Sequence, residues 1–209
     1  MAQRVSNIYR LITIPQLYAA LQSVLGAHRS RRRFVDEVLQ PVAGMRFLDV
    51  GCGPASILQY LPKVNYTGLD LNPEHIEYAR ARYADRGTFL VADVAKMKLE
   101  AAGSFDLILL SGLLHHLDDG PAMKLLADLI GLLKPDGRIV SIDGVWLSPQ
   151  NPIARLFNRL DSGKNIRTPD GYVKLTKHVP VRTECRTYRD SLRVPYDHFC
   201  MTLTLAPEA

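Results

Sequence analysis

Five short apolar segments alternate with helical patterns between residues 45 and 142, and this alternation limits the possible folds more than any other feature. Helical patterns over Pro73–Tyr83 and Pro121–Leu133 separate some of the segments, and Asn72 before Pro73 is typical of a helix start. Strands and helices that alternate at this spacing build βαβ units around a parallel sheet. The sequence therefore predicts a doubly wound α/β domain. Its expected strands are Met45–Val50, Tyr66–Leu71, Thr88–Ala92, Phe105–Ser111 and Arg138–Ile142.

Both ends of the chain depart from this alternation. Gln16–Leu39 has the pattern of two amphipathic helices, interrupted by Gly26 and the basic run Arg29–Arg33. Ser148–Pro169 is rich in Asn, Pro, Arg and Gly, too irregular for a core strand. We expect a helix over Pro169–His178 and closing strands near Thr183–Leu192 and Phe199–Leu205.

The composition excludes several classes of protein. A hydrophobic share of 47% with 22% charged residues is typical of a globular domain and not of a disordered chain. No apolar run approaches the roughly 18–20 residues of a membrane span, and Arg4, Arg10 and Pro15 interrupt any signal-peptide pattern. The three cysteines lack CxxC spacing, so neither a disulfide framework nor a zinc site is expected. These features predict a cytoplasmic protein.

A glycine-rich turn follows the first expected strand. Gly51, Cys52 and Gly53 form a Gly-x-Gly sequence that allows a ligand to approach the backbone closely, although many ordinary strand–helix turns contain one. Asp70 ends the second expected strand, where a carboxylate can accept hydrogen bonds from both ribose hydroxyls of a nucleoside. The alternative role of Asp70 as a helix cap is better filled by Asn72.

Asp93 ends the third expected strand in the same way. It can accept a hydrogen bond from an adenine amino group while Leu71 and Val94 sandwich the ring. An Asx-turn that simply leaves the strand is the alternative interpretation.

These segments together resemble the class I S-adenosylmethionine-dependent methyltransferases. The resemblance covers about residues 45–142 and is continued by His115-His116-Leu117 and by Leu132–Arg138. It implies a seven-stranded sheet with an antiparallel last strand, in one domain over residues 1–209. It also implies a helical cap (1–44), a cofactor-binding core (45–147), a substrate lid (148–180) and closing strands (181–209). Its cofactor contacts fall on Asp49, Gly51 and Gly53 for the methionine moiety, Asp70 for the ribose, Asp93 for the adenine, and Ser111 near the methionine end.

The glycine-rich turn differs from the family pattern at one position, and it also bears on an alternative class of protein. The family often has glycine where Ala55 stands, so the turn is expected to be tighter or shifted here. A nicotinamide-dependent dehydrogenase needs a third glycine for close helix–strand packing, and Ser56 occupies that position.

His115 follows the fourth expected strand, beside the crevice between cofactor and acceptor. By position it resembles the histidine that acts as a base in several small-molecule O-methyltransferases, and its ordinary pKa near neutrality suits that role. A histidine that only packs or caps the next helix is the alternative. His116 is expected to point into the structure.

Charge is distributed unevenly and bears on the methyl acceptor. The chain has 26 Lys and Arg against 21 Asp and Glu, with the basic excess at its two ends. Asn165 and Arg167 are expected to bind an anionic or lipid-like acceptor, and Tyr9 and Tyr18 to cover the cleft. Amphipathic N-terminal helices that contact a membrane surface are a weaker hypothesis.

The sequence thus predicts transfer of a methyl group from S-adenosylmethionine to a small molecule, with no metal. An RNA methyltransferase, favoured by the pI of about 9.2, and a non-catalytic cofactor-binding subunit remain open alternatives. The acceptor atom and the oligomeric state are not determined by the sequence.

Overall fold

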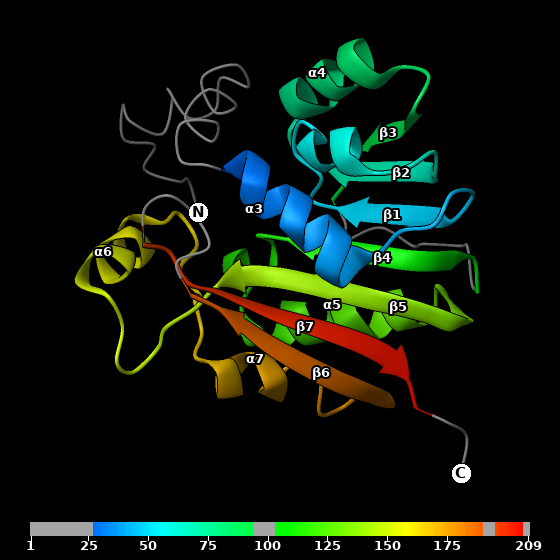
Figure 1. The fold of residues 1–209 in the computed structure, drawn as a ribbon. Helices are drawn as coiled ribbons and strands as arrows, with labels where there is room; N and C mark the ends of the chain where they lie inside the picture. Colours follow the sequence, from blue (N-terminus) through cyan, green and yellow to red (C-terminus); the bar gives the residue numbers. More distant parts are fainter. Residues whose placement is uncertain (1–26, 94–102, 190–194, 207–209) are drawn as a thin grey trace.

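The computed structural model describes residues 27–93, 103–189 and 195–206. Its centre is a seven-stranded sheet in the order β3-β2-β1-β4-β5-β7-β6 (Figure 1). β7 runs antiparallel to both β5 and β6, and the other neighbouring strands are parallel. The strands are β1 Arg46–Val50, β2 Asn65–Asp70, β3 Gly87–Val91, β4 Phe105–Ser111, β5 Leu133–Gly144, β6 Val181–Tyr188 and β7 His198–Leu205. The predicted doubly wound sheet with an antiparallel last strand is confirmed.

Helices cover both faces of this sheet, with α3 in front of it and α5 behind it in Figure 1. Leu107 and Leu109 of β4 are buried in one core with α3 and α4, whereas Ile108 and Leu110 are buried in a second core with α5 and α7. This alternation along β4 is expected for a strand that is covered on both faces. The helices are α3 Ala27–Phe34, which continues into a π-helical turn at Val35–Leu39, α4 Pro73–Tyr83, α5 Asp119–Ile130, α6 Pro152–Leu160 and α7 Pro169–Lys174.

Two helices begin at an Asn-Pro pair. The Asn72 side chain accepts a hydrogen bond from the backbone N–H of Glu74 at 2.9 Å, which confirms the predicted start of α4. Asn151 accepts in the same way from the N–H of Ile153 at 2.9 Å and begins α6. Because Pro at the first helical position costs no hydrogen bond, the pair favours a helix start. α6 is an ordered element inside the segment that we expected to be irregular.

The boundary between α5 and β5 differs from the expectation. α5 ends at Ile130 instead of the expected Leu133, and β5 begins at Leu133, which is an earlier start than the expected Arg138. An irregular register between β4 and β5 accommodates it. A Cβ at Gly137 would lie 2.7 Å from the carbonyl oxygen of Phe105, so only glycine fits there.

Several expectations lie outside the described residues. These are the contacts of Tyr9, Tyr18 and Val94 and most of the predicted N-terminal helices. Within the described residues, no helix is both long and apolar enough to cross a membrane.

Candidate active site

The glycine-rich turn after β1 uses backbone conformations that favour glycine. Gly51 and Gly53 have φ angles of +74° and +54°. A Cβ on Gly51 would lie 3.2 Å from Cδ1 of Leu113, so the turn packs closely against the segment that follows β4. Ala55, where the family resemblance led us to expect glycine, also lies in the left-handed region, at φ 52° and ψ 35°. The turn therefore keeps the left-handed bend at this position, with an alanine in place of glycine.

Asp49 places a buried carboxylate immediately before this turn. Its Oδ2 accepts a hydrogen bond from the Tyr66 hydroxyl at 2.7 Å, and its Oδ1 has no partner among the described residues. Burial raises the pKa of Asp49 to about 7, partly opposed by the hydrogen bond from Tyr66. A cationic group of a ligand near Oδ1 would stabilise the ionised carboxylate.

Asp70 joins the end of β2 to the same turn. Its Oδ2 accepts from the N–H of Gly53 at 2.7 Å, and its Oδ1 accepts from the N–H of Asn72 at 2.8 Å. Burial opposes ionisation of Asp70, but hydrogen bonds from His75 and from these two backbone groups lower its pKa. An ionised, partly exposed carboxylate retains further lone pairs for a ligand's hydroxyl groups.

The remaining expected cofactor contacts lie along the same edge of the sheet. Asp93 follows β3, and the exposed Ser111 ends β4, and both lie at the carboxyl ends of strands in the parallel part of the sheet. Leu71 follows β2 and is 69% exposed although it is a large apolar residue. Cys52 is half-buried within the turn, and burial raises the pKa of its thiol. An exposed leucine beside two acidic strand ends suits the flat face of a nucleoside base.

His115 is buried and held between two carboxylates. Its Nδ1 lies 2.8 Å from Oδ1 of Asp143, and its Nε2 lies 3.3 Å from Oδ1 of Asp161. Burial opposes protonation, but the hydrogen bonds with Asp143 and Asp161 raise the pKa of His115 to about 9. Both ring nitrogens are therefore engaged, and this arrangement leaves no free lone pair to accept a proton from a substrate.

His116 has the opposite environment from the one we expected. Its side chain is exposed rather than directed into the structure, and its ring centroid lies 4.2 Å from that of His115. Partial desolvation and the positive charge of His115 lower the pKa of His116. The residue that packs inward is His115, because Asp143 provides a buried hydrogen-bond partner for its ring.

The segment after α6, residues 161–167, encloses His115 and is named here the clasp. A Cβ on Gly163 would lie 1.9 Å from Cδ2 of His115, so the backbone of the clasp touches the ring directly. The backbone N–H of Asn165 donates to the carbonyl oxygen of His115 at 3.0 Å. The Asn165 side chain also donates to Asp118 at 3.1 Å.

Arg167 fastens the clasp to the segment after β4. Its guanidinium donates to the carbonyl oxygens of Leu114 and Leu117 at 2.9 and 2.7 Å, and to Asp119 at 2.8 and 2.9 Å. The side chain is only 9% exposed. This placement differs from the expected acceptor-binding role, because the donors of Arg167 are directed to groups within the chain. Arg32 and Arg33 of the basic N-terminal run likewise form ion pairs with Asp36 and Glu37.

Asp143 and Asp161 were not among the residues singled out from the sequence. Asp143 lies near the end of β5, after the apolar run Ile139–Ile142, as Asp70 and Asp93 do in their strands. Applying the same argument to the fifth strand would have found it. Asp161 ends α6, and no local pattern distinguishes it from other helix-terminal acids.

Comparison with known proteins links this geometry to one family. Residues 48–141 match the methyltransferase domain family. The chain is 33% identical over 114 residues to a ubiquinone biosynthesis O-methyltransferase of Xanthomonas axonopodis, over 52% of the chain and 46% of that protein. It is 32% identical over 120 residues to a ubiquinone/menaquinone biosynthesis C-methyltransferase of Desulfotalea psychrophila, over 55% of the chain and 47% of that protein. The chain thus matches slightly under half of the length of these relatives.

Solved structures share the fold at low sequence identity. A TehB-like S-adenosylmethionine-dependent methyltransferase of Corynebacterium glutamicum has a TM-score of 0.68 at 20% identity, over 95% of this chain and 100% of that one. Human N-acetylserotonin methyltransferase in complex with S-adenosylmethionine has a TM-score of 0.70 at 21% identity, over 96% of this chain and 57% of that one.

Proposed function

The chain carries a class I S-adenosylmethionine-dependent methyltransferase domain, and on that premise we propose that it methylates a hydroxyl group of a small aromatic acceptor. The observation that supports this most directly is the row of carboxylates at the carboxyl ends of β1, β2 and β3, beside the glycine-rich turn. One of these carboxylates, Asp49, has a buried oxygen without a partner among the described residues. The residues therefore fit a ligand that combines a nucleoside with cationic groups.

The cofactor supplies an activated methyl group when it is bound. In the proposal, Asp70 accepts the ribose hydroxyls, Asp93 with Leu71 and Val94 binds the adenine, and Gly51, Cys52 and Gly53 accommodate the methionine moiety. Asp49 offers negative charge to the same moiety, and Ser111 lies at its end. Apart from Val94, which lies outside the described residues, each of these roles uses a group at the same edge of the sheet.

The acceptor is proposed to bind beside His115 and His116. With S-adenosylmethionine bound, its activated methyl group would pass to the hydroxyl oxygen of the acceptor, and S-adenosylhomocysteine would be the second product. The hydroxyl proton leaves to solvent. The protein's part in such an in-line displacement is to align the two reactants and exclude water.

We assign the acceptor to phenols and hydroquinones rather than to anions. One of the two relatives described above is named a ubiquinone biosynthesis O-methyltransferase, and Arg167, the residue expected to bind an anion, donates to groups within the chain. A phenolic hydroxyl is more acidic than an alcohol, so less is required of the protein to remove its proton.

Calorimetric titration with S-adenosylmethionine tests the cofactor half of this proposal. Asp70→Ala is expected to weaken binding at least about 100-fold, equivalent to roughly 2.8 kcal/mol. Asp85→Ala, which changes an exposed aspartate beyond α4, serves as the matched control and should bind like the unmodified chain. Unchanged affinity in Asp70→Ala would contradict the ribose assignment.

Release of S-adenosylhomocysteine tests the acceptor half. A panel of catechols and hydroquinones is compared with a panel of carboxylates and phosphate esters that contain no phenol. Turnover is expected with the first panel. Turnover confined to the second would overturn the assignment while leaving the cofactor assignment intact.

A further inference from the structure

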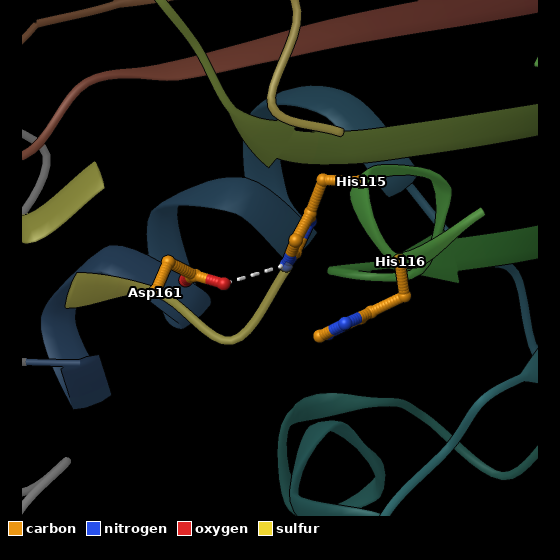
Figure 2. A group of neighbouring side chains, drawn as sticks. All are labelled: His115, His116 and Asp161. Carbon is orange, nitrogen blue, oxygen red and sulfur yellow. Dashed lines mark ion pairs between the residues drawn. The ribbon is translucent and has the colours of Figure 1, made fainter. Parts of the chain in front are cut away.

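Three side chains that could ligate a metal converge beside the proposed acceptor position. They are His115 and His116, which follow β4, and Asp161, which follows α6 (Figure 2). We infer that these three residues form a binding site for one divalent transition-metal ion. The inference deepens the proposed function, because the ion would lie on the acceptor side of the cofactor, but binding itself does not depend on methyl transfer.

The distances fit a single ion. One potential ligand atom from each residue lies within 4.8 Å of the other two. Nε2 of His115 and Oδ1 of Asp161 are 3.3 Å apart, which matches the separation of about 3.3 Å expected for two ligands at tetrahedral angles around Zn²⁺. The ion would replace the proton between these two atoms, and that proton would leave to solvent. His116 is exposed and its ring contacts that of His115, at a centroid separation of 4.2 Å, so a small rotation of the His116 ring would complete the set.

The surroundings of His115 are typical of a metal ligand. Oδ1 of Asp143 accepts a hydrogen bond from Nδ1 of His115 at 2.8 Å, and this directs Nε2 of His115 toward Asp161. Carboxylates orient metal-bound histidines in the same way, and they also make the ligating nitrogen more basic. Asp161 is itself oriented, because its Oδ1 accepts from the backbone N–H of Gly163 at 2.6 Å. Both of these groups are thus positioned by further hydrogen bonds.

The ligand types select the class of metal. Imidazole nitrogens favour Zn²⁺, Fe²⁺ or Co²⁺ over Mg²⁺ and Ca²⁺, which prefer oxygen. Two histidines and one carboxylate leave coordination positions open for other ligands. Within the proposed function, a phenolic oxygen would take an open position, where the ion would lower the pKa of its hydroxyl group and orient the oxygen.

Calorimetric titration of the full-length, metal-free protein with Zn²⁺ tests the inference. One saturable site per chain is expected. Asp161→Asn and His116→Ala should each weaken binding at least about 100-fold, because each removes one of three protein ligands. Asp136→Asn and His178→Ala, which change exposed residues elsewhere, serve as matched controls and should retain the site.

Cobalt gives a readout that is independent of affinity and of activity. Co²⁺ bound by these residues should produce visible ligand-field absorption that both site variants lose and both controls keep. Absence of a saturable site in the unmodified chain would overturn the inference. So would metal binding by Asp161→Asn and His116→Ala that is as tight as in the unmodified chain. Titration of the same samples with S-adenosylmethionine keeps the two proposals separate: an unmodified chain that binds S-adenosylmethionine but shows no metal site refutes only the metal.

Discussion

The two sides of the proposed active site are built differently. On the cofactor side, Asp49, the glycine-rich turn and Asp70 lie within about twenty residues of one another, and a buried carboxylate oxygen lacks a partner among the described residues. On the acceptor side, His115 contacts Asp143 and Asp161, which are 28 and 46 positions away. Its buried imidazole has both nitrogens engaged. The cofactor side is thus locally encoded and prepared for a ligand, whereas the acceptor side is assembled from distant segments.

The carboxylates on the two sides also differ in their pKa shifts and in whether they already pair with an imidazole. Burial raises the pKa of Asp49 to about 7. Burial also opposes the ionisation of Asp161, but hydrogen bonds from His115 and from the backbone of Gly163 lower its pKa. A carboxylate whose pKa is raised by burial becomes ionised more readily when a cation binds beside it, so it suits the binding of a cationic cofactor. A carboxylate already paired with an imidazole instead fixes the position of that ring.

If the acceptor side depends on distant contacts, removal of its main fastening should have the largest effect. Arg167→Ala is expected to destabilise the protein by about 3 kcal/mol, because it leaves several carbonyl oxygens and Asp119 without their donor. Urea unfolding measures the change. Arg155→Ala, at an exposed position on α6, should cost less than about 0.5 kcal/mol. Equal effects would show that the hydrogen bonds of Arg167 contribute little to stability.

The close contact between the clasp and His115 gives the next effect. Gly163→Ala places a Cβ 1.9 Å from Cδ2 of His115, so the ring or the clasp must move. We expect a loss of about 2 kcal/mol in stability. Gly120→Ala has no atom within 4 Å of the new Cβ and should be neutral or slightly stabilising. Unchanged stability in Gly163→Ala would mean that the clasp shifts to accommodate the new methyl group without loss of stability.

This difference explains how much could be predicted from the sequence. The doubly wound sheet was accessible because its strands and helices alternate in a recognisable local pattern, and the family resemblance implied its antiparallel last strand. Asn72 was correctly identified as a helix cap, since the partner of its side chain is two residues away. Local patterns carry such information directly.

The acceptor side was less accessible for a physical reason. Arg167 in a loop rich in Gly and Asn indicates anion binding as readily as a structural role, and only the fold brings Leu114 and Leu117 to its guanidinium. We expected His116 to point into the structure, but the structure buries His115 and exposes His116. Buried Asp143 decides between the two rings, and it lies on a different strand. Partners that are distant in sequence leave no local pattern.

The unpaired oxygen of Asp49 predicts a pH dependence on the cofactor side. The ordinary pKa of an unfolded aspartate is near 4, so between about pH 4 and 7 the folded chain binds the extra proton. Stability should therefore fall as the pH rises through this window and then level off. Asp49→Asn removes this contribution, so its stability relative to the unmodified protein should improve by about 1–2 kcal/mol between pH 6 and 8.

Unfolding curves across this pH range, with Asp136→Asn as an exposed control, measure the difference. Saturating S-adenosylmethionine should reduce it, because a bound cation favours the ionised carboxylate. A constant gap between Asp49→Asn and the unmodified protein would show that Asp49 keeps an ordinary pKa.

The smallest expected effect concerns Ala55, the one non-glycine residue of the turn in the left-handed region. Ala55→Gly relieves a backbone cost of about 1 kcal/mol but removes a fully buried methyl group worth about 0.8 kcal/mol. The net change should thus be within about 0.5 kcal/mol. Ala79→Gly, equally buried but within α4, loses both the methyl group and helix propensity and should cost about 2 kcal/mol. Thermal unfolding of the two variants compares them directly, and equal losses would show that the turn carries no strain at Ala55. A difference of about 1.5 kcal/mol would instead show that the cofactor turn keeps a strained alanine whose methyl group fills the core beneath it.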